Sequence, residues 1–210
     1  INEKIPGMYK INDLDNNDQK NGKHIMNALK RENFQRNCIV RGLNDATDED
    51  WIIISDLDEI PNLKNSELKN IKSPIVFFKQ LMMYYKFNLI LENYSWVGSK
   101  ACKKKTLKSP QWLRNIKDRA YPWWRLDVLF SENKYIKIKI IENGGWHFSY
   151  LKRPEDIEKK LKSYLHHTEY ELNPIGIKNI KKMIIDKKTI YNLKVDSRSN
   201  KFDGGNILKK

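Results

Sequence analysis

The chain has 210 residues, of which 40% are hydrophobic, so it suits one globular domain with a sizeable core rather than a disordered or fibrous protein. Its 40 basic and 26 acidic residues give a formal net charge of +14. This surplus favours anionic partners, namely nucleotide sugars, phospholipid surfaces, acidic glycans or nucleic acid, and does not choose among them. An AT-rich genome would also enrich lysine without a functional cause. We expect a single domain over residues 1–210.

The first elements along the chain are a loop and a helix. Residues 1–22 are polar and predict a loop-like start. From residue 23 to residue 43 apolar side chains recur at helical spacing, and Gly42 lies near the expected end. The polar side of this helix carries Arg36, with Asn37 beside it. A solvated helix face is the structural alternative to a binding role for both.

The next element ends in carboxylates. The apolar run at residues 51–54, β-branched at three positions, predicts a buried strand that leads into Asp56, Asp58 and Glu59. In open α/β sheets ligands lie beyond the carboxyl ends of strands. Two carboxylates one residue apart can hold a hard cation such as Mg²⁺ or Mn²⁺, which in turn binds phosphate oxygens. An acidic surface turn is an equally ordinary interpretation.

The middle of the chain predicts more of the sheet. Residues 66–71 suit a short helix, and residues 75–78 and 81–85 suit two strands. The five lysines of residues 100–108 indicate a solvated loop more than a phosphate path.

An aromatic and basic segment follows. Trp112, Trp123 and Trp124 alternate with arginines over residues 112–125. Interleaved rings and arginines can also bind single-stranded nucleic acid, although no nucleic-acid-binding motif accompanies them.

The last third predicts one strand, a glycine turn and two helices. Residues 135–140 alternate as a strand with one wet face, and the pair Gly144 and Gly145 then precedes His147. Helices are expected to begin near Pro154 and Pro174, and residues 196–210 are expected to be an irregular tail. The second helix is basic and amphipathic, so it could lie on an anionic membrane, but packing against the domain is favoured.

Several separated motifs carry a family resemblance. Residues 55–61 (SDLDEIP), preceded by residues 31–37 (RENFQRN) and followed by residues 144–150 (GGWHFSY), resemble glycosyltransferase family 17. Together with residues 160–169 they span most of the region from residue 31 to residue 171. The family includes the bisecting N-acetylglucosaminyltransferases of N-glycan synthesis and bacterial and viral members. Three motifs in the right order are far more specific than one Asp-x-Asp pair.

The resemblance implies an α/β fold of the GT-A type, a mixed central sheet flanked by helices with the Asp-x-Asp loop at the carboxyl edge of a central strand. It implies metal-dependent, inverting transfer of a sugar, N-acetylglucosamine above all, from a UDP-sugar donor to a hydroxyl of a glycan acceptor. Family members carry a strand–helix–strand portion before the segment that matches residues 31–37. We do not find that portion here, so we expect an incomplete N-terminal part of the fold.

The resemblance also assigns roles to residues. Asp58 would bind Mn²⁺ or Mg²⁺ directly, and Asp56 would hold it through water or touch the ribose. His147 would supply a further metal contact, and Arg36 and Asn37 would help to bind the donor nucleotide.

An inverting displacement also needs a carboxylate that takes the proton of the acceptor hydroxyl. The candidates are Asp127 and Glu169, followed by Glu142. Glu59, beside the metal motif, would orient that motif.

Two other interpretations stay open. One is a basic, non-enzymatic binding module for nucleic acid or anionic glycans that uses residues 112–125, whereas the transferase has no need of nucleic acid. The other is a degenerate transferase that has kept the fold and lost the activity.

The location of the protein is expected to be cytoplasmic. Cys38 and Cys102 are too few for a disulfide framework, which favours a reducing compartment. The sequence shows no signal peptide and no apolar run of the length that spans a bilayer. Golgi-type anchoring stays open if a start is missing, as does contact with a membrane surface.

Overall fold

The computed structural model describes residues 4–64, 67–163, 170–171, 173–193 and 205–210. Its helices are α1 Asn17–Asn37, α2 Pro110–Asn115, α3 Pro154–Ser163 and α5 Gly176–Ile185. Its strands are β1 Trp51–Ile54, β2 Glu59–Pro61, β3 Ile75–Tyr84, β4 Ile90–Lys103, β5 Ile138–Ile141 and β6 Gly145–Ser149. Short 3₁₀ turns occupy Cys38–Gly42, Leu68–Asn70, Lys104–Thr106 and Leu126–Val128.

Strand β3 is the centre of a mixed six-stranded sheet. Antiparallel β4 lies along one edge of β3, and β1 pairs antiparallel with β4 beyond it. Along the other edge, β5 and then β6 pair parallel with successive halves of β3. Antiparallel β2 pairs with β6. The backbone N–H of Gly144 donates to the Lys79 carbonyl (2.8 Å) between β5 and β6, so the two short strands follow one edge in sequence.

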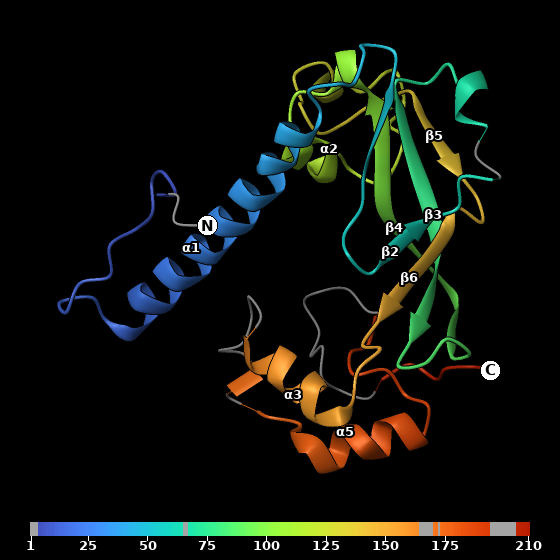
Figure 1. The fold of residues 1–210 in the computed structure, drawn as a ribbon. Coiled ribbons are helices and arrows are strands. Elements are labelled where there is room, and N and C mark those ends of the chain that lie inside the picture. Colours follow the sequence, from blue (N-terminus) through green and yellow to red (C-terminus); the bar gives the residue numbers. More distant parts are fainter. Residues whose placement is uncertain (1–3, 65–66, 164–169, 172, 194–204) are drawn as a thin grey trace.

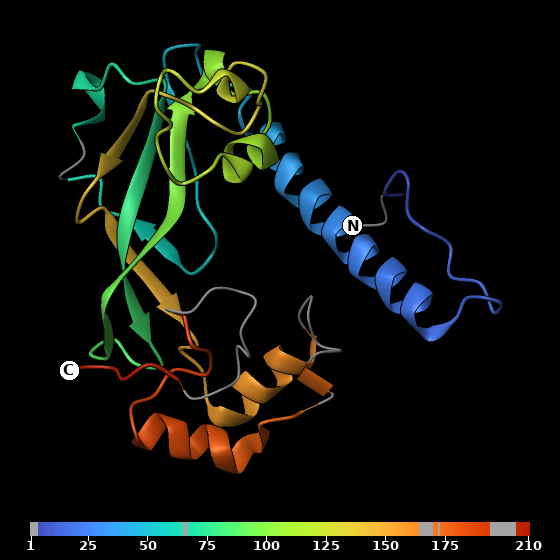
Figure 2. The ribbon, with the colours of Figure 1, turned by 180° about the vertical axis from the view of Figure 1, so that it is seen from behind.

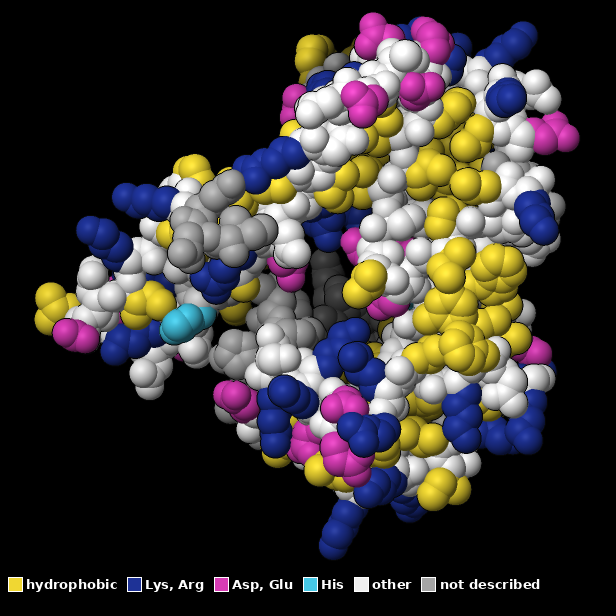
Figure 3. Space-filling view, in the orientation of Figure 1, with side chains coloured by type: hydrophobic (Ala, Val, Ile, Leu, Met, Phe, Trp, Pro, Cys, Tyr) yellow, Lys and Arg dark blue, Asp and Glu magenta, His cyan; other side chains and the backbone are white. Residues whose placement is uncertain are grey.

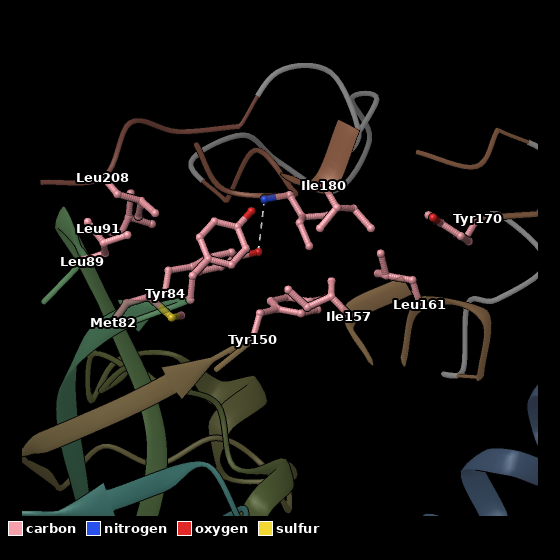
Figure 4. Packing of buried hydrophobic residues seen from close by; sticks show 12 residues of the cluster. Met82, Tyr84, Leu89, Leu91, Tyr150, Ile157, Leu161, Tyr170, Ile180 and Leu208 are labelled. Carbon is pink, nitrogen blue, oxygen red and sulfur yellow. Dashed lines mark hydrogen bonds between the residues drawn. The ribbon is translucent and has the colours of Figure 1, made fainter. Parts of the chain in front are cut away.

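Hydrophobic clusters cover both faces of the sheet near β1 and also its lower end, where α3 and α5 lie in Figure 1. Ile52 and Ile54 of β1 pack with α2 on one face, while Trp51 and Ile53 pack with residues near the turn Leu68–Asn70 on the other. At the lower end, α3 and α5 pack on a third cluster. Figure 4 shows members of this cluster from distant parts of the chain: Met82, Tyr84, Leu91, Tyr150, Ile157, Leu161, Ile180 and Leu208.

Helix α1 extends away from the sheet and meets the rest of the molecule at its C-terminal end, as both opposite views show (Figures 1 and 2). Its last turn lies beside α2. The C-terminal end of α1 is therefore the part of the helix that can contribute to a site on the sheet.

The predicted α/β class with a mixed sheet and helices is confirmed. The expectation that the Asp-x-Asp loop follows a central strand is wrong, because β1 lies at an edge of the sheet and not at its centre. The uninterrupted apolar run of β1 is explained by the clusters on both of its faces. A strand at the edge of a sheet, with a single neighbouring strand, can therefore still have both of its faces buried.

Several boundaries also differ from the sequence-based predictions. The polar start contains the first turns of α1, which begins at Asn17. The two strands expected at residues 75–78 and 81–85 are one continuous strand, β3. Strand β4 runs into the lysine-rich segment that was expected to be a loop, and it buries Lys100. The helices expected after Arg153 and Asn173 are confirmed as α3 and α5.

Within the described residues, none of the helices has the length and apolar character needed to cross a membrane. Cys38 and Cys102 are both free thiols. Burial raises the pKa of the Cys102 thiol to about 12, which keeps it in the protonated, unreactive form.

Candidate functional site

The connection between β1 and β2 carries the carboxylates and borders a hollow between α1, the sheet and α3 (Figures 1 and 3). Strand β1 ends at Ile54, and β2 begins at Glu59, whose register partner in β6 is His147. The N–H of Glu59 donates to the Asp56 carbonyl (3.0 Å), which closes a tight turn. The sheet thereby fixes both ends of the segment from Ser55 to Asp58.

Asp56 lies between two arginines that come from different helices. Arg114 of α2 donates to one carboxylate oxygen of Asp56 at 2.8 Å, and Arg36 of α1 donates to the other at 3.3 Å. All three side chains are partly buried. Arg114 also donates to the Gly98 carbonyl (3.2 Å), so its position is fixed from two sides. Asp56 thus joins α1, α2 and the end of β1.

Asp58 lies beside His147. The Nε2 atom of His147 is 3.5 Å from the Asp58 carboxylate, and its Nδ1 atom is 3.1 Å from the sulfur of Met82. The interaction with His147 outweighs the opposing effect of burial and lowers the pKa of Asp58. The ring of Trp96 stacks on the imidazole, with centroids 4.9 Å apart. The His147 ring is therefore held on both its edge and its face, while the Asp58 side chain is 38% exposed.

Asp56, Asp58 and Glu59, together with the side chains that contact them, form one cluster, which we call the Asp58 cluster. Glu59 is its buried carboxylate, since its side chain is 1% exposed. Its oxygens accept hydrogen bonds from the indole N–H of Trp96 (2.6 Å), the backbone N–H of Asp56 (3.1 Å) and the hydroxyl of Ser99 (3.3 Å). Ser99 in turn accepts from Gln80 and from Ser55, at 2.9 and 2.6 Å. As predicted, Glu59 is placed to orient the motif, because it holds the backbone of Asp56 from inside.

Asn37 links two helices. Its side-chain oxygen accepts from the backbone N–H of Gln111 at 3.0 Å, which satisfies a donor in the first turn of α2. Arg36 donates to the side chain of Gln111 as well. Of the predicted donor-binding pair, Arg36 therefore lies next to the carboxylates, and in this structure both residues connect α1 to α2.

The residues present suit a hard metal ion that shares its coordination with a diphosphate. The Asp58 carboxylate and the His147 imidazole lie close enough to bind one ion, whereas both oxygens of Asp56 accept from arginines. Among the described residues, no three His, Cys, Asp or Glu side chains form a metal-binding group. Mg²⁺ sites commonly use one or two protein carboxylates and take substrate phosphates and water for the rest. Two protein ligands are compatible with such a site.

The predicted general bases lie outside this cluster. Asp127 accepts from Arg125 (2.8 Å) and Lys134 (2.6 Å), and the Arg125 hydrogen bond is the main cause that lowers its pKa to about 2. Glu142 pairs with Lys79 at 3.0 Å, at the end of β2 that is opposite to Asp58. Glu169 lies outside the described residues. Because its pKa is so low, Asp127 is a weak base, and it could accept a proton only if its ion pairs with Arg125 and Lys134 were broken.

Two pockets lined by described residues do not include the carboxylates at the end of β1. One of about 600 Å³ lies between residues 67–73 and β5. Another of about 210 Å³ includes Gln80 and Trp146 beside the glycine turn.

Sequence reasoning missed Arg114, Ser99 and Trp96 as members of the cluster. Arg114 stood out only as one of several arginines among tryptophans. No spacing rule connects it with Asp56, which lies 58 positions away. Trp112, the first tryptophan of the proposed nucleic-acid surface, is buried and donates to the Glu132 carbonyl (3.0 Å).

Comparisons with protein-family models, with curated proteins and with solved structures found no match to this chain.

Proposed function

We propose that this chain is a metal-dependent inverting glycosyltransferase of GT-A type that transfers a sugar, N-acetylglucosamine in the first instance, from a UDP-sugar to a glycan hydroxyl. The observation that carries the proposal is the meeting of Asp58 and His147, 3.5 Å apart at the end of a strand. These residues belong to two of the three separated motifs. The third motif contributes Arg36, which reaches the same loop through Asp56.

Each residue of the cluster has a role under this proposal. Asp58, which is partly exposed, and His147 would hold Mn²⁺ or Mg²⁺. With a metal bound, His147 would present the Nε2 lone pair to the ion beside Asp58 and would keep its proton on Nδ1, which faces the Met82 sulfur. When bound, the metal would neutralise the developing charge of the diphosphate leaving group.

The arginines would serve the diphosphate. Arg36 and Arg114 present two guanidinium groups at Asp56, two residues before Asp58, and bidentate guanidinium groups suit phosphate oxygens. Asp56 keeps both in place before the donor binds. Its role is then to position the arginines, in addition to the water-mediated metal contact or ribose contact that the resemblance implies.

The test is a thermal-shift titration with UDP and UDP-sugars, with and without Mn²⁺, on the wild-type chain and on Asp58→Asn. A ligand that binds the folded state at about 100 times its Kd stabilises it by about 2.7 kcal/mol. We expect a shift with UDP that requires Mn²⁺ and is absent in Asp58→Asn. Asp13→Asn, an exposed carboxylate before α1, is the matched control and should behave as wild type.

Turnover separates the active from the degenerate transferase. Release of UDP from the preferred sugar nucleotide by the wild-type chain, and not by Asp58→Asn, supports an active enzyme. If the chain binds the sugar nucleotide in a metal-dependent way but releases no UDP with any acceptor class tested, it is a transferase that has lost activity. Absence of any nucleotide shift in a folded protein would remove the proposal.

A further inference from the structure

A short segment between α2 and β5 exposes a series of large apolar side chains. Within residues 122–130 the exposed fractions are 79% for Trp123, 65% for Trp124, 72% for Leu126, 69% for Leu129 and 89% for Phe130. We call residues 122–130 the apolar loop. Single exposed hydrophobic residues are ordinary, but a contiguous group of them marks an interaction surface.

The loop is held in this exposed conformation. Tyr121 and Val128 anchor it in the protein, since both are buried. The N–H of Tyr121 donates to the Tyr135 carbonyl (3.0 Å), and within the loop Val128 donates to the Arg125 carbonyl (3.1 Å). Because Val128 points inward, the large residues on either side of it point outward. The exposure is a consequence of ordered turns.

Cationic groups surround the base of the loop. Arg119, Arg125 and Lys134 lie 5.1, 5.3 and 5.7 Å from the centre of the Tyr121 ring. Asp127 pairs with both Arg125 and Lys134 and so keeps them beside the loop.

The wider segment is strongly basic. Residues 101–140 contain eleven Lys and Arg side chains and three Asp and Glu side chains, a net charge of +8 out of the +14 of the whole chain. The basic residues are Lys103, Lys104, Lys105, Lys108, Arg114, Lys117, Arg119, Arg125, Lys134, Lys137 and Lys139. This segment lies at the end of the molecule away from α3 and α5 (Figures 1 and 2).

We propose that the apolar loop docks this protein onto the surface of an anionic lipid bilayer. Tryptophan side chains favour the boundary between headgroups and acyl chains, and Leu126, Leu129 and Phe130 can enter the acyl region beside them. Arg119, Arg125 and Lys134 then lie at the level of anionic headgroups, which attract basic residues. The inference is independent of the proposed catalytic function, because it uses none of the residues of the Asp58 cluster.

Other partners fit this surface less well. A single-stranded nucleic acid stacks on flat rings, but Leu126 and Leu129 have no aromatic face, and Trp112 is buried. A second copy of the chain would bring two like-charged surfaces together in a symmetric contact, which is unfavourable. A bilayer accommodates both the aliphatic and the cationic groups.

The experiment is co-sedimentation of the full chain with vesicles of phosphatidylcholine alone and of phosphatidylcholine mixed with phosphatidylserine. The test variant is Trp123→Ser/Trp124→Ser/Phe130→Ser. The matched control is Leu14→Ser/Ile185→Ser, which removes apolar side chains that are 99% and 77% exposed elsewhere. Circular dichroism and Tm establish that both variants fold, which is expected because the substituted side chains are exposed.

We expect the wild-type chain and the control to bind the anionic vesicles, and binding of the test variant to fall by about tenfold or more. Arg119→Gln, which removes a cation at the base of the loop, should reduce binding by about fivefold, and added salt should weaken it. Absence of binding to anionic vesicles, or equal binding by the test variant, would overturn the proposal. Two other results would also overturn it, each together with a lack of vesicle binding by the wild-type chain. One is binding of a single-stranded oligonucleotide that the test variant loses. The other is formation of a dimer that the test variant loses.

Discussion

Gly98 of β4 lies directly against the carboxylate of Glu59, so closely that a Cβ atom on Gly98 would be 1.9 Å from Glu59 Oε1. The same atom would be 2.4 Å from the indole nitrogen of Trp96, which donates to that oxygen. The absence of a side chain at Gly98 is therefore what lets Glu59 lie buried under the Asp56 backbone.

The first prediction concerns this contact. Gly98→Ala should displace the Glu59 carboxylate and break its hydrogen bond from Trp96, lowering the free energy of unfolding by about 2 to 3 kcal/mol. Denaturant unfolding measures this. Gly22→Ala is the control, because Gly22 lies within α1 with open space around it, and this change should stabilise the protein by up to about 1 kcal/mol. Equal stability of Gly98→Ala and wild type would show that Glu59 has another position available.

The second prediction separates the two aspartates of the motif. Asp56→Asn should weaken the ion pairs with Arg36 and Arg114 and lower the free energy of unfolding by about 1 to 2 kcal/mol, while part of the Mn²⁺-dependent UDP shift remains. Asp58→Asn should retain more stability and lose the whole shift. Calorimetric titration with Mn²⁺ and UDP checks both variants. Loss of the shift in Asp56→Asn alone would reverse the assigned roles.

The third prediction concerns the start of α1. The side chain of Asn16 accepts from the N–H of Gln19 (2.8 Å), and the side chain of Gln19 accepts from the N–H of Asn16 (3.0 Å). Asn16→Ala should cost about 1 kcal/mol in the free energy of unfolding, and Asn16→Gly only a few tenths. Urea unfolding followed by circular dichroism measures both. If Asn16→Ala matches wild type, the first turns of α1 do not contribute to cooperative stability.

The predictable parts of the fold are those with a local signal. Strand β1 and the helices α3 and α5 follow from an apolar run, a proline near a helix start and apolar residues at helical spacing. Strand β4 was not predictable, because its fourteen residues include Glu92, Asn93, Gly98 and Lys100 and show no steady alternation. It is stabilised by pairing with β3 on one side and β1 on the other, which only the tertiary structure reveals.

The same distinction holds at the candidate site. The proximity of Asp58 and His147 was expected because their motifs resemble one family's. The start of α1 was misjudged because its first turn is polar, although the capping pair Asn16 and Gln19 was visible in the sequence. Arg114 reaches Asp56 only because α2 packs beside the end of β1, and such a long-range contact leaves no pattern in the local sequence.

The last prediction concerns the buried lysine of β4. Lys100 is 4% exposed and donates to the Arg114 and Ile116 carbonyls at the end of α2, and burial lowers its pKa to about 8. Below that pH the lysine is charged in both states, so the folded protein bears the full cost of burying the charge. As the pH rises from about 8 to about 10.4, the folded state has lost the proton that the unfolded state still binds, so this cost disappears.

Relative to Lys100→Met, the wild-type chain should gain about 2 kcal/mol in free energy of unfolding between about pH 7 and about pH 10. Urea unfolding at both pH values measures the difference. Lys86→Met, an exposed site, should show no such gain. A constant difference between the wild type and Lys100→Met would mean that the two carbonyls fully compensate the buried charge.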